Sequence, residues 1–204
     1  MQIEKYELTK KNKYNVFLSN GEVLTLDERV ITENELLLKK TLDQELYDKV
    51  TRESKIYELV DISIKYISIR LRSIQEIKTY LQNKTEDKEI IDIVTSKLLN
   101  LGYLDDDKFT KAFIKDKLNF TSMGEYKIKM HLQRLGISYD IIEENISMID
   151  ENVLEEKIIK QIEKYLKTNR KYTGTNLKNK MYNHLVAEGF TKERVIRILN
   201  NYNF

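Results

Sequence analysis

A short pattern that recurs three times constrains the fold of this chain more than any other feature. The segments 77–81, 128–132 and 181–185 align at separations of 51 and 53 residues. Glycine follows the last two segments, at Gly136 and Gly189, and predicts a tight corner after a helix. Repeats of this size pack mainly on their neighbours, so we expect several small cores along the chain.

Each five-residue segment is predicted to belong to a larger repeat that contains a long helix, a short helix and a third helix. The chain then divides into three tandem three-helix repeats, at 51–104, 105–150 and 151–204. Thr85 stands where the first repeat would have its corner glycine. The expected fold is mainly α, with the repeats in an elongated curved array.

Residues 1–50 differ from the repeats and predict a small N-terminal β-hairpin followed by a short helix. The runs 3–8 and 14–26 are rich in β-branched and aromatic residues, and Asn20-Gly21 is typical of a type I′ turn. This turn would pair Leu18 with Val23 and Phe17 with Leu24. The sheet would have two or three strands and would need a helical body to lean on.

Helix boundaries are predicted by capping residues. We expect a short helix over 27–33 and a capping box at 41–44 that opens a long helix ending near Ile69. Ser73 and Glu76 form a second capping box, which begins the short helix of the first repeat.

The segment 98–109 contains a helix stop and a helix start with almost nothing between them. Gly102 can take the left-handed conformation that ends a helix, and Asp105 is a good N-cap for the next one. Asp106 and Asp107 then lie in the first helical turn, where the helix dipole favours carboxylates. We favour capping over a metal site, because consecutive positions fan around a helix. The predicted structural corners are Ser73, Gly102, Asp105, Gly136 and Gly189.

Composition argues against several classes of function. The chain has no cysteine, two histidines and six scattered glycines, so it matches no zinc spacing and no phosphate-binding loop. His131 and His184 occupy equivalent repeat positions, which a tandem array moves apart; we favour packing roles, with partner contact left open. We expect no cofactor and no catalysis. Without an apolar signal core or membrane-length run, we also expect a soluble, cytoplasmic protein.

The strongest functional signal is a lysine stripe in the third repeat. It consists of Lys157, Lys160, Lys164, Lys167 and Lys171, spaced for one helix face. Residues 151–204 contain eleven lysines and arginines against six acids. On these residues alone a solvated helix face is the simpler interpretation. The alternative is an electrostatic track for phosphates or for an acidic protein surface. Arg70, Arg72 and Lys78 form a second candidate group for binding a partner or nucleic acid.

These motifs together resemble the RecX family of regulatory proteins, which modulate the recombinase RecA. The resemblance is carried by Arg70-Leu-Arg-Ser73 with Glu76 and Leu81, Gly102-Tyr-Leu-Asp-Asp106 with Phe109, Gly124 with Ile128, Leu132 and Gly136-Ile137, and Leu185 with Gly189-Phe190. The set is specific in its order and spacing, although no single piece is. Thr85, Thr110 and a third repeat with few matching positions depart from the family pattern.

The resemblance implies a non-enzymatic regulator in DNA repair and recombination. Such a protein would bind a RecA-type recombinase, free or as a filament on single-stranded DNA. It would restrain ATP hydrolysis and strand exchange, or promote filament disassembly. Two alternatives stay open: a helical protein that acts on DNA directly, and a helical-repeat scaffold for another partner. We expect a monomer in either case.

Overall fold

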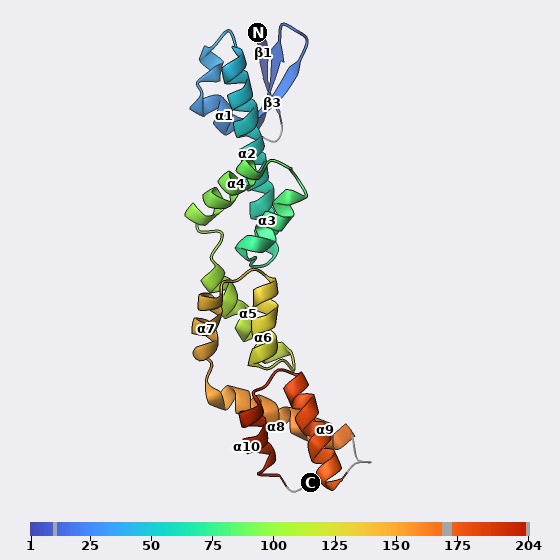
Figure 1. The fold of residues 1–204 in the computed structure, drawn as a ribbon. Helices are drawn as coiled ribbons and strands as arrows, with labels where there is room; N and C mark the ends of the chain where they lie inside the picture. Colours follow the sequence, from blue (N-terminus) through green and yellow to red (C-terminus); the bar gives the residue numbers. More distant parts are fainter. Residues whose placement is uncertain (10–11, 169–172, 203–204) are drawn as a thin grey trace. The chain divides into compact units, whose positions relative to one another are not determined.

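A computed structural model describes residues 1–9, 12–168 and 173–202 (Figure 1). The chain is mainly helical with a small N-terminal antiparallel sheet, as the sequence predicts. It forms two compact units. The first comprises Met1–Leu71 and Ile77–Leu104, and the second comprises Arg72–Glu76 and Asp105–Phe204. No helix in the described part of the chain is long and apolar enough to cross a membrane.

The sheet of the first unit has three strands in sequential order, β1 (Ile3–Leu8), β2 (Lys13–Leu18) and β3 (Val23–Asp27). Its inner face buries Val16, Leu18, Leu24 and Leu26. These side chains share one core with residues of the helices that follow, which gives the sheet the helical support that three strands require.

The predicted type I′ turn is wrong by one residue in register. Phe17 pairs with Val23 and Val16 with Leu24. Gly21 has φ +84°, and Asn20 does not share the positive φ that a type I′ turn needs at both positions. A three-residue loop forms instead, closed by the amide of Gly21 on the carbonyl of Leu18 at 2.9 Å. This register places Val16 and Leu24 together on the buried face and leaves Val23 exposed.

The helices of the first unit are α1 (Glu28–Glu33), η1 (Leu36–Leu38), α2 (Gln44–Ile69), most of α3 (Ile74–Gln82) and α4 (Lys88–Asn100). The long helix ends at Ile69 as predicted. The capping box at Thr41 is wrong: Asp43 caps α2 and accepts a hydrogen bond from the amide of Leu46 at 2.8 Å. Thr41 instead forms an isolated antiparallel β-bridge with Gln2, next to the N-terminal sheet.

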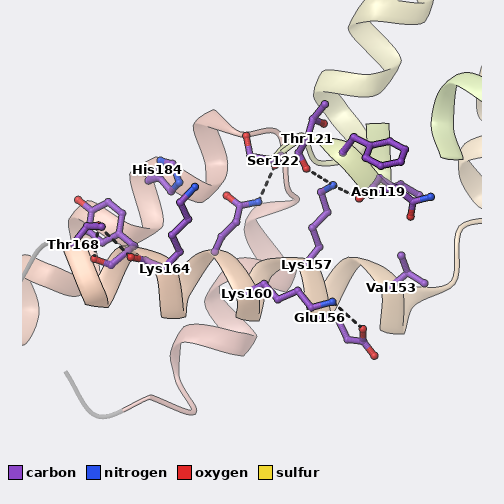
Figure 2. Close-up of a pocket in the computed structure, with 14 residues that line it drawn as sticks. Asn119, Thr121, Ser122, Val153, Glu156, Lys157, Lys160, Lys164, Thr168 and His184 are labelled. Carbon is purple, nitrogen blue, oxygen red and sulfur yellow. Dashed lines mark hydrogen bonds and ion pairs between the residues drawn. The ribbon is translucent and has the colours of Figure 1, made fainter. Parts of the chain in front are cut away.

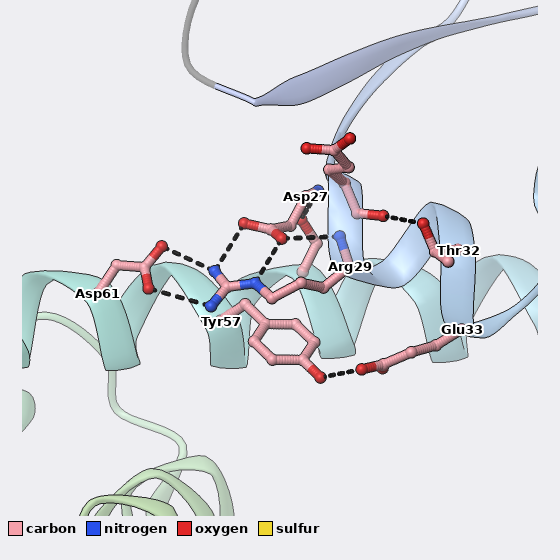
Figure 3. A network of polar contacts seen from close by, with 8 residues as sticks. Asp27, Arg29, Thr32, Glu33, Tyr57 and Asp61 are labelled. Atoms are coloured by element: carbon pink, nitrogen blue, oxygen red, sulfur yellow. Dashed lines mark hydrogen bonds and ion pairs between the residues drawn. The ribbon is translucent and has the colours of Figure 1, made fainter.

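An ionic network joins the N-terminal extension to α2 (Figure 3). The Arg29 guanidinium donates two hydrogen bonds to Asp27 and two to Asp61, at 2.7–3.2 Å. It also lies 4.2 Å from the centre of the Tyr57 ring, whose hydroxyl donates to Glu33 at 2.5 Å. The Arg29 hydrogen bonds lower the pKa of Asp27, and burial raises the pKa of Tyr57 to about 12. Both carboxylates therefore hold one planar cation, which fixes α1 along α2.

The second unit contains α5 (Asp106–Phe120), α6 (Glu125–Arg134), α7 (Tyr139–Ser147), α8 (Glu151–Thr168), α9 (Gly174–Ala187) and α10 (Lys192–Leu199). Two apolar clusters form its core, one from α5–α7 and the other from α8–α10. Leu118 and Ile149 pack against both clusters, so the two cores adjoin.

Glycine corners join successive helical triplets within this unit. The amide of Gly124, before α6, donates to the carbonyl of Glu188 at 2.8 Å, and that of Tyr126 donates to Gly189 at 2.9 Å. An equivalent joint lies 51 residues earlier, where the Ser73 hydroxyl donates to the carbonyl of Leu135 at 2.7 Å. The helices α3 and α6 thus each begin on the corner of the next triplet, and this repeated contact explains why the corner residues are small.

The remaining predicted corners are helix caps. Ser73 and Glu76 exchange hydrogen bonds between side chain and amide at 3.0 and 3.1 Å, which makes a complete capping box. Gly102 has φ +74°, and the amide of Tyr103 closes the end of α4 on Leu98 at 2.9 Å. Asp105 caps α5 by accepting from the amide of Lys108 at 2.9 Å.

The three consecutive acids at this corner have separate partners. Asp106 accepts from the amide of Ile74 at 2.9 Å, and Asp107 accepts from Asn145 and Lys111 at 2.8 and 2.7 Å. Burial raises the pKa of Asp106, whereas the Lys111 hydrogen bond lowers the pKa of Asp107. The pKa values of these neighbouring carboxyl groups are therefore shifted in opposite directions.

Replacing Asp106 by asparagine is expected to raise stability slightly at pH 7, by less than about 1 kcal/mol. A raised pKa in the folded state stabilises the fold at low pH, and this stabilisation is lost as the pH rises through that pKa. Above that pKa the fold must bury part of a charged carboxylate, and asparagine removes the cost of doing so. The gain should vanish near pH 3. Asp107→Asn is the matched control and should lower stability at pH 7. Urea titrations from pH 3 to 7 measure both, and two losses at pH 7 would contradict this account.

Candidate partner-binding groove

A groove of about 900 Å³ runs beside α8 on the second unit (Figure 2). One wall is the C-terminal end of α5 with residues 121 and 122, and the other is the face of α8 that carries Lys160 and Lys164. Both of these lysines are exposed, as is Lys167 one turn further on, which does not line the groove. Lys171 lies outside the described residues. The structure therefore brings Lys160 and Lys164 together at one surface.

Lys157 does not belong to the exposed stripe in which the sequence analysis placed it. Its side chain is buried, and its ammonium donates to the carbonyls of Lys117, Leu118 and Thr121 at 3.0, 2.6 and 2.6 Å. Burial lowers the pKa of Lys157. The last carbonyls of a helix lack intrahelical partners, and Lys157 supplies a donor from α8 to the carbonyls of Leu118 and Thr121 at the end of α5. The stripe is narrower than predicted because its first member forms the floor of the groove.

Lys157→Met is expected to destabilise the second unit by about 1–3 kcal/mol, because the part-buried carbonyls of Leu118 and Thr121 lose their charged donor. The control is Lys160→Met, which removes an exposed ammonium 3.6 Å from Glu156 and should change stability by less than about 0.5 kcal/mol. Urea unfolding followed by circular dichroism measures both. Equal effects would contradict a capping role for Lys157.

The rim of the groove combines exposed aromatic and cationic groups. Phe120 is 81% exposed at the end of α5, an unusual exposure for a large apolar ring. On the opposite side the Tyr165 ring lies 5.4 Å from that of His184, so this histidine reaches the groove. His131, its repeat equivalent, is half-buried on α6 and does not line the groove.

A smaller apolar pocket of about 280 Å³ adjoins the groove. Leu118, Asn119 and Val153 line both spaces, so the two lie next to each other. The rest of the smaller pocket is lined by Lys111, Ile114, Lys115, Asn145, Met148, Ile149 and Asp150. This pocket is not predicted from the sequence, although two of its lining residues, Met148 and Val153, are large apolar residues outside the core.

The second candidate group is distributed differently. Arg70 and Lys78 belong to the first unit and Arg72 to the second. The Arg70 guanidinium donates to the carbonyl of Leu71 at 2.8 Å, and Lys78 pairs with Asp92 at 3.0 Å. Arg72 lies 3.6 Å from Glu76 and is mostly buried. Local contacts therefore engage all three, which makes the α8 groove the better candidate site.

Comparisons with known proteins agree on one family. A sequence model described as RecX, second three-helix domain, matches residues 105–144. The chain is 33% identical to regulatory protein RecX of Finegoldia magna, over 99% of this chain and 100% of that protein. It is 30% identical to regulatory protein RecX of Halalkalibacterium halodurans, over 93% of this chain and 73% of that protein.

Solved structures show the same fold. The crystal structure of a regulatory protein RecX superimposes with a TM-score of 0.85 at 22% identity, over 98% of this chain and 99% of that chain. A second, RecX from Lactobacillus salivarius, gives a TM-score of 0.67 at 22% identity, over 71% of this chain and 94% of that chain. With these matches along nearly its whole length, the chain belongs to the RecX family of regulatory proteins.

Proposed function

We propose that this protein is a non-enzymatic cytoplasmic regulator that binds a RecA-type recombinase, free and as a filament on single-stranded DNA, and lowers its ATP hydrolysis and strand exchange. Membership of the RecX family supports this function. The observation in the structure that carries it is the groove beside α8, which is lined by two exposed lysines and an exposed phenylalanine. Such a surface suits an acidic or phosphate-bearing partner.

Regulation of this kind requires binding and no chemistry by the regulator. A ligand shifts an equilibrium between two states only by its unequal affinity for them. We propose that the three repeats, at 51–104, 105–150 and 151–204, contact adjacent recombinase protomers. A filament held in a geometry that turns over ATP slowly would then bind this protein more tightly than the active geometry does.

Co-sedimentation tests the proposal. The protein is mixed with recombinase filaments formed on single-stranded DNA with a non-hydrolysable ATP analogue, and with bare DNA at the same salt concentration. Retention in the filament pellet, with little retention on bare DNA at 0.15 M salt, is the expected result. Retention on bare DNA alone would favour a protein that acts on DNA directly.

That second function has an observation of its own in its favour. Single-strand binding sites combine aromatic rings with a basic track, and the exposed Phe120 lines the same groove as Lys160 and Lys164. The two functions differ in salt dependence. A protein that neutralises phosphates directly loses affinity for DNA steeply with salt, whatever protein is present.

Charge reversal of Lys160, Lys164 and Lys167 to glutamate is expected to weaken filament binding about tenfold, which corresponds to about 1.4 kcal/mol. The three side chains are exposed, so the fold should be unaffected. The matched control reverses Lys39, Lys65 and Lys88, three exposed lysines of the first unit, and changes the net charge equally. Co-sedimentation measures both. Unchanged binding by the stripe variant would show that these lysines only form a solvated helix face.

A further inference from the structure

We infer that the groove and the adjoining pocket together bind one acidic amphipathic segment of the recombinase, with a large apolar side chain in the pocket and carboxylates on the flanking lysines. This inference rests on the proposed function and names the part of the partner that the surface recognises. The two spaces share the lining residues Leu118, Asn119 and Val153, and each is also lined by lysines.

The pocket offers an apolar contact that the fold leaves uncovered. Ile114, Leu118 and Ile149 form its base, and Met148 and Val153 are 64% and 44% exposed at its edge. Exposed apolar side chains that gather around a concavity mark binding surfaces more often than isolated ones do. Methionine adapts its shape to the side chain that it meets, which suits an apolar anchor from another protein.

Cations lie on both sides of this apolar contact. Lys111 and Lys115 line the pocket, and Lys160 and Lys164 line the groove. Lys111 pairs with Asp107 at 2.7 Å and Lys160 with Glu156 at 3.6 Å. Among the described residues, no carboxylate lies within ion-pair distance of Lys115 or Lys164. A ligand with an acid at each side of an apolar residue would complement this arrangement.

The acids that line the two spaces do not oppose such a ligand strongly. Glu156 is the ion-pair partner of Lys160, and Asp150 accepts a hydrogen bond from the amide of Asn152 at 2.9 Å. The buried ammonium of Lys157 adds a further positive charge beneath the groove. Five lysines therefore line the two spaces, one of them buried, against two acids that already have partners within the protein. The net charge of this surface is positive.

A protein segment fits better than a nucleic acid strand. Single-strand binding combines a basic track with several rings on which successive bases stack. Phe120 supplies one such ring, whereas the Tyr165 ring packs near His184 at 5.4 Å. The pocket is lined by aliphatic side chains and lysine stems, which suit an aliphatic or aromatic anchor followed by carboxylates.

Site-specific photocrosslinking tests this inference in the full-length protein. Val153, which lines both spaces, is replaced by p-benzoylphenylalanine, and the protein is irradiated with recombinase filaments. The expected crosslink lies on a recombinase segment with at least two acids within four residues of a large apolar residue. Lys115→Glu combined with Lys164→Glu should lower its yield at least fivefold. The control places the photoreactive residue at Ile196, which is exposed on α10 away from both spaces and should not crosslink to that segment.

Three outcomes would overturn the inference. Crosslinking of position 153 to the DNA strand would identify the groove as a nucleic acid site. Absence of any crosslink, while the labelled protein still lowers ATP hydrolysis, would leave the proposed function intact and exclude this docking surface. If the wild-type protein does not lower ATP hydrolysis, the proposed function fails, and this inference loses its basis.

Discussion

Replacing Gly189 by alanine is expected to destabilise the second unit by about 2–4 kcal/mol, since left-handed strain adds to an overpacked contact. Gly189 has φ +94°, and a Cβ atom there would lie 2.6 Å from the backbone nitrogen of Lys127. The facing residue, Gly124, meets the same steric limit without left-handed strain, because its own Cβ would lie 2.6 Å from the backbone of Gly189. Backbone crowds backbone on both sides, so no side-chain rotation relieves the clash.

Gly102→Ala separates the two contributions. Gly102 has φ +74°, but no heavy atom lies within 4 Å of the position that its Cβ would occupy. Only the left-handed strain remains, and the expected loss is about 1–2 kcal/mol. Hydrogen exchange of the amides of α8–α10 for Gly189→Ala and of α4 for Gly102→Ala, together with urea unfolding, measures each effect in the full-length chain. A Gly189 variant no less stable than the Gly102 variant would contradict the close approach at this joint.

Arg194→Met is expected to cost about 3–5 kcal/mol, because it leaves a buried carboxylate without its cation. Arg194 on α10 pairs with Glu125 at the start of α6, and their side chains are 12% and 9% exposed. A second guanidinium nitrogen reaches Glu151 on α8 at 3.0 Å. One cation therefore joins three helices of the second unit.

Two variants show whether the loss comes from an uncompensated charge. Combining Arg194→Met with Glu125→Leu removes both partners and should recover most of the stability, since apolar replacement of a buried pair is close to neutral. Arg197→Met removes a 59% exposed guanidinium 2.6 Å from Glu155 and should cost less than about 1 kcal/mol. Calorimetric unfolding of the three variants gives the comparison. A double variant no more stable than Arg194→Met alone would contradict the electrostatic explanation.

The sequence predicted helix ends well where one residue determines the local geometry. Asp105 caps the start of α5 and Ile69 ends α2 as predicted, because capping and broken periodicity act within a few residues. The hairpin register was mispredicted, since Asn20-Gly21 is compatible with both two- and three-residue loops. Burial of Val16 opposite Leu24 selects between them, and this depends on the core that the strand meets.

The candidate site was predicted only in part for the same reason. Helical spacing placed Lys157 and Lys160 on one face, but it carries no information on what packs against that face. The end of α5 covers Lys157 and leaves Lys160 exposed. Likewise, the glycine corners were visible in the repeat, whereas the contact between Gly124 and Gly189 joins residues 65 positions apart. Small residues at the equivalent positions Ser73 and Gly124 were the available signal.

The most direct test of the regulatory function is a titration of the protein into recombinase, single-stranded DNA and ATP, in which ATP hydrolysis and strand exchange are followed together. Both rates should fall as the protein approaches an equimolar ratio to the recombinase. The variant with glutamate at positions 160, 164 and 167 should need about ten times more protein for the same effect. Unchanged rates at an equimolar ratio of wild-type protein would contradict the proposed function.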